Sequence, residues 1–363
     1  MDLAIVGSRG IPAHYGGYET FAEELSTRLT DRGYEVCVTC EGYGQAKWYN
    51  NVNLIYVPII TKIIPRNLAE VIHDICAIMY VSIFIRPKII YLLGYAACYT
   101  CIISRCLGIK VWINADGLEW KRRKFGSVGR AIIKALEGIA VKVSNLMIAD
   151  SKHIQKYLFE EYHINSSYIP YGAYPVKDID PNLITKFNTR PKEYYLVVAR
   201  IEPENNIDVI IDGFVKSNSK KQLIVVGKVQ NNNYGKMLLC KASDRVHFIG
   251  GIYDKNLLNA LRLHCFAYFH GHEVGGTNPS LLEALACGNI IIAIDVPFTR
   301  EVARNAAYFF TDASSLCEVI NEVESSYINY PEREELSRDR LIKAGYTWDN
   351  VLKCYQILLE KNV

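Results

Sequence analysis

The stretch that decides the fold is LAIVGSRGIPAHYGGYE, residues 3–19. Residues 3–7 form a short apolar run typical of a buried parallel strand, and residues 18–32 have the spacing of an amphipathic helix. A strand that passes through a glycine-rich turn into a helix is the opening unit of a doubly wound α/β sheet. The turn has neither the G-x-G-x-x-G nor the G-x-x-x-x-G-K-S/T pattern, which argues against an NAD enzyme and a P-loop ATPase.

The alternation of strands and helices continues along the chain. We therefore predict two α/β domains, residues 1–175 with a returning C-terminal helix at 346–363, and residues 190–345. Between them, Pro175, Pro181 and Pro191 indicate a linker at 171–193. In the first domain, further strands are expected at 35–40, 54–57, 89–93, 111–114 and 146–149, and helices at 68–85 and 96–107. In the second, strands are expected at 195–199, 222–226, 246–248, 265–269 and 290–294, and helices at 207–216, 254–263 and 279–286, with a last helix at 348–361.

Length and composition fit this organisation. The chain has 363 residues, enough for two domains, and 50% of them are hydrophobic, which excludes a disordered protein. A net charge of +3 excludes a strongly basic nucleic-acid binder. Residues 1–170 nevertheless hold 19 basic and 15 acidic residues, a surplus that suggests an anionic partner.

No targeting or membrane-spanning segment is expected from the sequence. Residues 1–6 lack the basic region and cleavage site of a signal peptide. The longest uncharged run, residues 89–104, is shorter than the roughly 20 residues that a spanning helix needs. We expect a soluble or peripheral membrane protein.

The cysteines allow two interpretations. Cys37 with Cys40, and Cys98 with Cys101, form two C-x-x-C pairs that could hold zinc. Residues three apart on a strand point to opposite faces, however, and the second pair lies in an apolar helical stretch. We favour small buried thiols in a reducing cytoplasm.

Two strand-to-helix turns of the first domain carry candidate site residues. In the first turn, Gly16 and Gly17 precede a helix whose N–H groups could meet a phosphate, and Arg9 and His14 add polar reach; the alternative is a glycine-rich surface loop. In the second turn, Asp116 follows a strand end beside a glycine, where a substrate of an open α/β sheet would bind. The alternative there is an Asp-Gly turn followed by a solvated basic run at 121–124.

Two turns of the second domain are the other candidates. Arg200 ends the first strand and could clamp a diphosphate, with Lys228 after the next strand as a second cation. The turn at 270–284 combines glycines with a Thr-Asn-Pro helix start, and its Glu283 could accept hydroxyl hydrogen bonds. A metal site at His270 and His272 with Glu273 is the less favoured alternative, because the sequence shows no further ligand pattern beside them.

Together these turns resemble those of family 4 glycosyltransferases with the GT-B fold, over nearly the full chain. Arg200 and the segment 283–288 are general features of that family. Segments 7–12, 15–21, 116–121 and 275–284 resemble the branch of bacterial β-1,4-rhamnosyltransferases of capsule and cell-wall polysaccharide assembly. Two positions depart from the family pattern: Gly275 stands where a first glutamate is usual, and Asn205 where a lysine is usual.

The resemblance implies two Rossmann-like domains facing an interdomain cleft, the first for the acceptor and the second for a nucleotide-sugar donor. It implies a retaining transfer, of rhamnose from dTDP-rhamnose in the named branch, without a metal or other cofactor. The implied catalytic residues are Asp116, Arg200 and Glu283. The implied donor-binding residues are Gly16, Gly17, Arg200, Lys228, His272, Gly276, Thr277, Asn278, Ser280 and Glu283. The implied acceptor-binding residues are Arg9, His14, Tyr15, Asp116, Glu119 and Trp120.

Other functions remain open on the sequence alone. The same fold serves nucleotide-sugar epimerases, and a non-catalytic sugar-nucleotide-binding protein is a further alternative. We expect a lipid-diphosphate-linked saccharide as acceptor and a peripheral position at an anionic membrane, on the inner face of the cell membrane. The basic run 121–124 and the apolar, basic segment 59–66 ahead of the helix 68–85 suggest this. The alternative is that 121–124 is a solvated helix face and 68–85 belongs to the core.

Overall fold

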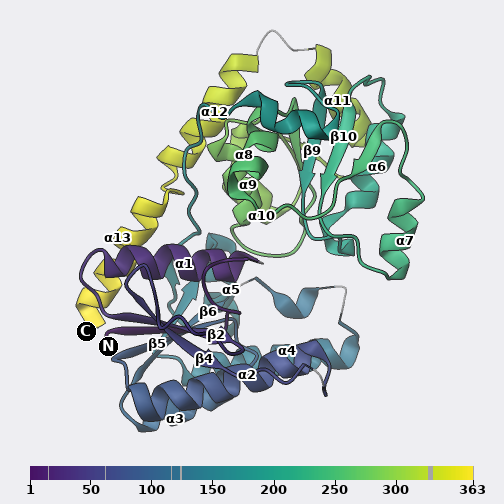
Figure 1. Cartoon of the computed structure of the whole chain (residues 1–363). Helices are drawn as coiled ribbons and strands as arrows, with labels where there is room; N and C mark the ends of the chain where they lie inside the picture. The colour runs from purple at the N-terminus through teal and green to yellow at the C-terminus, as the bar shows by residue number, and fades with distance from the viewer. Residues whose placement is uncertain (15, 62, 116, 123–124, 326–329, 363) are drawn as a thin grey trace. The chain divides into compact units, whose positions relative to one another are not determined.

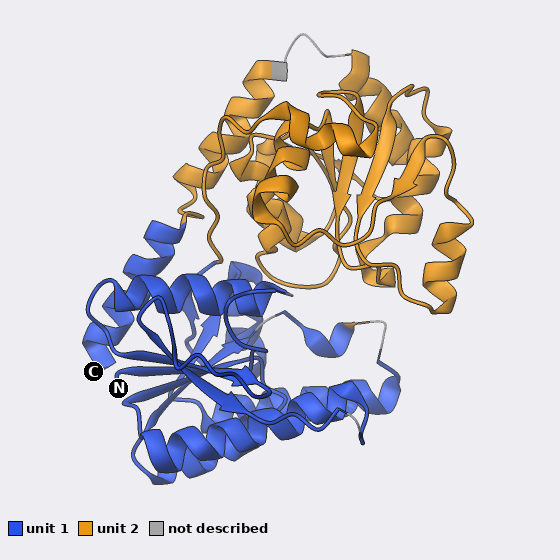
Figure 2. Cartoon of the chain, in the orientation of Figure 1, with its two compact units in different colours: residues 1–121, 125–170, 348–363 blue, residues 122–124, 171–347 orange. Residues whose placement is uncertain are grey.

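The structure is a computed structural model that describes the chain except residues 15, 62, 116, 123–124, 326–329 and 363. The chain divides into two compact units (Figure 2). Unit 1 contains residues 1–121, 125–170 and 348–363, and unit 2 contains residues 122–124 and 171–347. Each unit is a parallel α/β layer, as the sequence predicts. Residues 171–175 and 346–347, expected in the first domain, are grouped with unit 2.

The sheet of unit 1 has eight strands in the order β3-β4-β2-β1-β5-β6-β7-β8 among the described residues. All neighbours are parallel except β3 and β4. The apolar runs are continuous because helices cover both faces of the sheet (Figure 1). The strands are β1 (Leu3–Val6), β2 (Val36–Glu41), β3 (Trp48–Tyr49), β4 (Val52–Val57), β5 (Ile89–Leu93), β6 (Lys110–Ala115), β7 (Leu146–Ala149) and β8 (Ser167–Tyr168).

The helices of unit 1 differ from the prediction in two places. The expected helix 68–85 is an α-helix that ends in a π-helical turn, and the expected helix 96–107 is a 3₁₀ turn followed by a short α-helix. Figure 1 shows α1 on one side of the sheet and α2, α3 and α4 on the other. The elements are α1 (Gly17–Thr30), α2 (Arg66–Tyr80), η1 (Val81–Ile85), η2 (Cys98–Thr100), α3 (Cys101–Cys106), η3 (Glu119–Lys121), α4 (Ser127–Val143), α5 (Lys152–Tyr162) and α13 (Trp348–Asn362).

The C-terminal helix α13 completes the core of unit 1. Its Tyr355 is buried and lies 2.7 Å, oxygen to oxygen, from the hydroxyl of Tyr91 on β5. The Phe21 ring of α1 packs against both tyrosines, with ring centroids 5.8 and 5.9 Å away. Helix α13 is therefore part of the same core as β5 and α1, far apart in sequence.

Among the described residues, one segment of unit 1 is long and apolar enough to cross a membrane by length and composition. It is Arg66–Ile85, which comprises α2 and η1, and only 33% of its most apolar window is buried. This segment is not a long uncharged run in the sequence, because Glu70 and Asp74 interrupt it.

The sheet of unit 2 has six parallel strands in the order β11-β10-β9-β12-β13-β14 over the part of the chain that the structure describes. Its core contains aromatic rings among many aliphatic side chains, and Tyr195 stacks on Phe269 at 4.9 Å between centroids. The strands are β9 (Tyr194–Val198), β10 (Gln222–Val226), β11 (Val246–Phe248), β12 (Ala267–His270), β13 (Ile291–Ile294) and β14 (Ala307–Phe310). The helices are η4 (Pro181–Phe187), η5 (Pro203–Asn205), α6 (Ile207–Lys216), α7 (Asn233–Leu239), α8 (Lys255–His264), α9 (Pro279–Ala286), α10 (Pro297–Ala303), η6 (Arg304–Ala306), α11 (Ala313–Ser325) and α12 (Tyr330–Lys343).

The segment expected as a linker is partly ordered structure of unit 2. It contains the 3₁₀ helix η4, and Ala173 forms an isolated parallel bridge with Thr347. The amide of Ala173 donates to the carbonyl of Tyr346 at 2.9 Å. The incoming and outgoing ends of unit 2 are thus paired with each other.

Cys37, Cys40, Cys98 and Cys101 are buried free thiols. Burial raises the pKa of Cys37, Cys98 and Cys101 to about 12, so these thiols stay protonated at neutral pH. Over the described part of the chain, no group of three or more His, Cys, Asp and Glu side chains is arranged to hold a metal ion.

Candidate functional site

Three neighbouring strands of unit 2 end at one edge of its sheet. Strand β9 pairs with both β10 and β12, all in parallel, so the turns that follow these strands lie together. Arg200 follows β9 and Lys228 follows β10, and both side chains are exposed. A Cβ on Gly227 would lie 2.2 Å from the carbonyl oxygen of Ala199, so only glycine permits this close approach of the two strand ends. The edge therefore presents two cations from adjacent strands.

The turn between β12 and α9 is fixed by local hydrogen bonds. The Asn278 Oδ1 accepts the amide of Ser280 at 3.0 Å, which caps α9, and Pro279 occupies its first turn. The hydroxyl of Ser280 donates to the same oxygen at 3.0 Å and lies 3.0 Å from the donating hydroxyl of Tyr268. Thr277, which precedes the cap, is buried. The predicted donor-binding residues of this turn thus form a rigid helix start.

Two stacked histidines lie beside that helix start. The rings of His270 and His272 are 4.5 Å apart between centroids and 16° from parallel. The Nδ1 atom of each is buried and has no hydrogen-bond partner among the described residues. With Gly276 and Asn278 they line a small pocket, together with Val274, Gly275, Phe298 and Thr299. Of the predicted donor-binding residues, the pocket brings together His272, Gly276 and Asn278.

These histidines are neutral. Burial lowers the pKa of His270 to about 3. Burial, then the charges of His270, Arg200 and Arg122, hold the pKa of His272 well below its usual value. A neutral imidazole can accept or donate one hydrogen bond at each nitrogen, which suits hydroxyl groups better than phosphates.

Glu283 has a partner that the sequence did not reveal. Its carboxylate forms an ion pair with the guanidinium of Arg262, on α8, whose side chain is 2% exposed. Arg262 also donates to Asn259 Oδ1 at 3.2 Å. The one signal in the sequence was an arginine on the apolar side of helix α8, among Leu257, Ala260 and Leu261. Arg262 therefore holds the carboxylate of Glu283 in place.

The turn after β9 contains a second buried ion pair. Glu204 is 1% exposed, and within the described ranges neither of its carboxylate oxygens has a hydrogen-bond donor. The Arg122 Nη1 lies 3.7 Å from Glu204 Oε1, and Arg122 is 9% exposed. The expectation that Arg122 belongs to a solvated or membrane-facing basic run is therefore wrong, because the buried carboxylate attracts it into unit 2. Lys121 is exposed, and Arg123 and Lys124 lie outside the described residues.

Asn205, at the position where the family that the sequence resembles usually has a lysine, shapes the turn. Its Nδ2 donates to the carbonyl of Arg200 at 2.7 Å. The next residue, Asn206, donates to the carbonyl of Gly271 at 2.9 Å and to Glu273 Oε2 at 3.2 Å. These bonds tie the turn after β9 to the turn after β12. Glu273 therefore faces the β9 turn.

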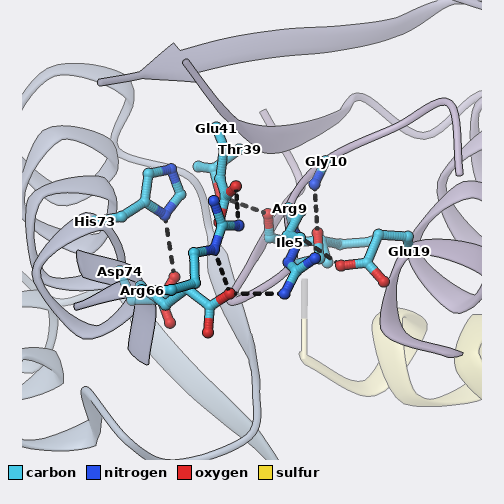
Figure 3. A network of polar contacts seen from close by, with 11 residues as sticks. Ile5, Arg9, Gly10, Glu19, Thr39, Glu41, Arg66, His73 and Asp74 are labelled. Carbon is cyan, nitrogen blue, oxygen red and sulfur yellow. Dashed lines mark hydrogen bonds and ion pairs between the residues drawn. The ribbon is translucent and has the colours of Figure 1, made fainter. Parts of the chain in front are cut away.

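In unit 1, carboxylates hold the first glycine-rich turn (Figure 3). Glu19 Oε1 accepts the amide of Arg9 at 3.0 Å. Glu23 Oε2 accepts the amide of Ala13 at 2.7 Å. A Cβ on Gly16 would lie 2.9 Å from Glu19 Oε2. The start of α1, predicted to attract a phosphate at Gly16 and Gly17, thus already carries a negative side chain.

The side chain of Arg9 is fixed by a network of ion pairs (Figure 3). Its Nη2 lies 2.8 Å from Glu70 Oε1, and Arg66 Nε lies 2.8 Å from the same oxygen. Arg66 also pairs with Glu41 on β2. Of the other residues predicted for this turn, His14 is exposed and Tyr15 lies outside the described residues.

The second turn of unit 1 follows β6, two strands from β1 in the sheet. Asp116 itself lies outside the described residues. Glu119 and Trp120 form the 3₁₀ turn η3, and the Trp120 ring lies 5.1 Å from the ammonium of Lys134 on α4. Lys134 in turn pairs with buried Glu137 at 3.1 Å. Helix α4, which the sequence analysis did not identify, therefore positions the predicted acceptor-binding tryptophan.

Two family models match the chain. Residues 1–174 match "Domain of unknown function (DUF1972)", and residues 182–348 match "Glycosyl transferases group 1". The chain therefore carries a group 1 glycosyltransferase domain, which coincides with most of unit 2.

Relatives and solved structures agree with this match. One subunit of human phosphatidylinositol N-acetylglucosaminyltransferase is 20% identical, over 93% of this chain and 71% of its own length. Sucrose-phosphate synthase from Thermosynechococcus elongatus has a similar structure, with a TM-score of 0.83, 15% identity and 99% and 98% of the two chains covered. HepE from Anabaena, solved in complex with UDP and glucose, has a TM-score of 0.77 and 15% identity, over 99% and 100% of the two chains. The predicted GT-B fold is confirmed, and the comparisons support a glycosyltransferase with a nucleotide-sugar donor.

Proposed function

We propose that this protein transfers rhamnose, with retention of anomeric configuration, from dTDP-rhamnose to a lipid-linked saccharide during polysaccharide assembly. The observation that carries the donor half is the edge of unit 2, where Arg200 and Lys228 follow adjacent strands beside the neutral histidine pair. The donor has an anionic diphosphate and an uncharged sugar, and the edge offers a matching group for each.

The diphosphate would bind at the cations. Arginine can bond two phosphate oxygens at once, and lysine adds a second charge. Stabilising the developing charge of the leaving diphosphate is the main catalytic task in such a transfer. The structural neighbour HepE was solved with UDP and glucose, which supports a nucleoside diphosphate as the leaving group here as well. We propose that no metal is required, because these side chains and the start of α9 supply the positive potential.

The sugar and ribose hydroxyls would bind at Glu283 and the histidine pocket. Arg262 orients the Glu283 carboxylate, whose oxygens can accept hydroxyl hydrogen bonds. Gly276, Thr277, Asn278 and Ser280 surround the same helix start. Rhamnose as the transferred sugar rests on the resemblance of segments 7–12, 15–21, 116–121 and 275–284 to the rhamnosyltransferase branch.

The transfer would proceed on one face of the sugar. The bond between the anomeric carbon and the diphosphate oxygen breaks, and a bond to the acceptor oxygen forms on the same face. The acceptor's proton passes to the leaving phosphate oxygen. Asp116 would orient the acceptor hydroxyl, with Arg9, His14, Tyr15, Glu119 and Trp120 around the acceptor. A lipid-linked acceptor is supported by the human relative, whose name contains phosphatidylinositol.

A panel of nucleotide sugars tests the donor. Thermal unfolding should shift most with dTDP-rhamnose, since a ligand at about 100 times its Kd adds about 2.7 kcal/mol. A larger shift with another nucleotide sugar would refute rhamnose but keep a transferase. Donor turnover without a glycosylated acceptor would instead favour an epimerase, and binding without turnover a non-catalytic protein.

The variant Asp116→Asn tests the catalytic assignment. It should bind the donor as the wild type does and transfer sugar at least about a hundredfold more slowly. Gly117→Ala is no suitable control, because Gly117 has a positive φ of 63°. Glu160→Gln, on an exposed face of α5, is the matched control. Transfer by Asp116→Asn within a few-fold of wild type would reduce Asp116 to a turn residue.

A further inference from the structure

Helix α2 and its π-helical continuation η1 expose an apolar stripe on unit 1. Leu68, Met79, Ile83 and Phe84 are exposed, and Phe84 is 70% accessible. The half-buried Ile75 lies seven residues after Leu68, and Met79 and Ile83 follow at intervals of four, which places these four side chains on one helical face. This face is the reason that only a third of the apolar window is buried.

The segment lies on the surface of unit 1 and does not span a membrane. Its opposite face is buried, at Ala69, His73, Ala77 and Ile78. The segment connects β4 to β5, which lie in the same sheet. Both ends of the segment formed by α2 and η1 are therefore anchored to one layer, and the apolar stripe points away from it.

The neighbouring helices extend the stripe into a surface. Helix α3 packs against α2, η1 and α4. Ile102 of α3 is 58% exposed, and Val128 and Ile132 of α4 are 72% and 56% exposed. We call the exposed side chains of α2, η1, α3 and α4 the docking face.

The exposed charges at the docking face are positive. Arg86 directly after η1, Arg105 of α3, and Arg130 and Lys142 of α4 are exposed. The three acidic residues of these fully described elements are not available to a partner. Glu70 pairs with Arg9 and Arg66, Asp74 is largely covered beside His73, and Glu137 is buried.

We propose that the docking face binds the surface of an anionic lipid bilayer. Apolar side chains of such a helix enter the headgroup region while arginine and lysine meet anionic lipid. A symmetric dimer through this face would bring its basic side chains opposite one another, which disfavours a second copy as the occupant. The inference places the membrane contact on α2, η1, α3 and α4, whereas the sequence pointed to residues 59–66 and 121–124.

The docking face would hold the protein at the membrane, where a lipid-linked acceptor is found. Only this purpose rests on the proposed function. Vesicle binding needs no nucleotide sugar, and donor turnover on a soluble saccharide needs no vesicle. Failure of the docking face and failure of the proposed transfer are therefore distinguishable.

The experiment is co-sedimentation of the full chain with vesicles. Vesicles of phosphatidylcholine with phosphatidylglycerol should bind the protein, those of phosphatidylcholine alone should bind it far less, and rising salt should release it. The triple variant Met79→Ser, Ile83→Ser and Phe84→Ser should lose binding by roughly tenfold or more. The matched control is Met237→Ser with Leu239→Ser, which are exposed apolar residues of α7 in unit 2 and should bind as the wild type does.

A second variant separates charge from apolar contact. Arg130→Ser with Lys142→Ser should lower binding to the phosphatidylglycerol vesicles and leave the residual binding to phosphatidylcholine unchanged. Equal binding of wild type and triple variant would overturn the proposal. So would a wild-type dimer that the triple variant converts to a monomer in light scattering, because the docking face would then be an interface between copies.

Discussion

The turn after β1 in unit 1 and the turn after β12 in unit 2 both follow a central strand of their sheet but differ in how their polar groups are satisfied. In unit 1, Glu19 and Glu23 accept backbone amides, and Glu70 holds Arg9. In unit 2, the Nδ1 atoms of His270 and His272 have no hydrogen-bond partner in the described part of the chain. The first turn is neutralised by its own side chains, whereas the second keeps buried nitrogens that a ligand hydroxyl could bind.

The difference indicates which substrate each turn suits. In the turn after β1, Arg9 is already paired and Glu19 lies at the start of α1, so this turn attracts an anion only weakly. It suits a neutral saccharide hydroxyl. A turn with neutral histidines next to exposed Arg200 and Lys228 suits an uncharged sugar attached to a diphosphate. The difference supports our proposal that unit 1 binds the acceptor and unit 2 the donor, although Arg200 also lies 3.8 Å from Glu202 Oε2.

The largest effect is expected at Arg200. Arg200→Ala should weaken the binding of a nucleoside diphosphate by about 2–4 kcal/mol, because the phosphate would lose its arginine partner. Calorimetry with the nucleoside diphosphate measures it. The matched control is Arg190→Ala, an exposed arginine that precedes the same strand at its opposite end. If Arg200→Ala and Arg190→Ala bind alike, the anion site is not on this edge.

The histidine pair should make unit 2 sensitive to acid. The pKa of His270 is about 3 in the folded chain against 6.5 in the unfolded chain, so the unfolded chain binds more protons between these values. The stability contributed by neutral His270 is complete above pH 6.5 and decreases as the pH falls, by about 2 kcal/mol between about pH 6.5 and 5. Urea unfolding of wild type and His270→Gln across this range measures it. A wild-type slope in His270→Gln would show that His270 is not the acid-sensitive group.

A smaller loss is expected when the acceptor of an amide in the first turn is removed. Glu19→Ala should lower the free energy of unfolding by about 1–2 kcal/mol, because the amide of Arg9 loses its partner. Glu19→Gln keeps a carbonyl acceptor and should lose less. Thermal unfolding compares both with Glu160→Ala, an exposed residue of α5. Equal stability of all three would mean that the turn does not depend on this carboxylate.

The smallest effect is expected at Tyr49, whose hydroxyl donates to Glu23 Oε1 at 2.7 Å. This hydrogen bond, then burial, raises the pKa of Tyr49 to about 12. Tyr49→Phe should cost about 0.5–1 kcal/mol, since Glu23 keeps the amide of Ala13 as a donor. Thermal unfolding measures this loss, and spectroscopic titration should show one tyrosine fewer near pH 12. If Tyr49→Phe lowers the free energy of unfolding as much as Glu19→Ala does, the turn depends on the Tyr49 hydroxyl as much as on the Glu19 carboxylate.

The fold was predictable where buried apolar residues were dense. The strand at 89–93 and the helix at 207–216 were predicted with their observed bounds, since both are dense in buried apolar residues. The helix α5 was not, because its buried positions are few and its surface is charged. The two-residue strands β3 and β8 are too short to show any periodicity.

The sequence predicted individual residues of the candidate site but not their ion-pair partners. Turn chemistry identified Arg200, Asn278 and Glu283, and all three lie in unit 2, in or just beyond the turns that follow its central strands. The partners Arg262 and Arg122 were missed, because each meets its glutamate only through tertiary packing. Their local sequence signal is weak: for Arg262 it is an arginine among the apolar residues of α8.

The place of α13 has a consequence for the order in which the chain can fold during synthesis. Apart from residues 122–124, unit 2 is continuous in sequence, so its sheet can close as soon as residue 347 has left the ribosome. Unit 1 is interrupted, and its aromatic core at Phe21 and Tyr91 waits for Tyr355, which follows Tyr91 by 264 residues in the chain. Contacts of such sequence separation form late. The half of the molecule that is made first is therefore the half that is finished last, and until α13 is made its aromatic core stays incomplete.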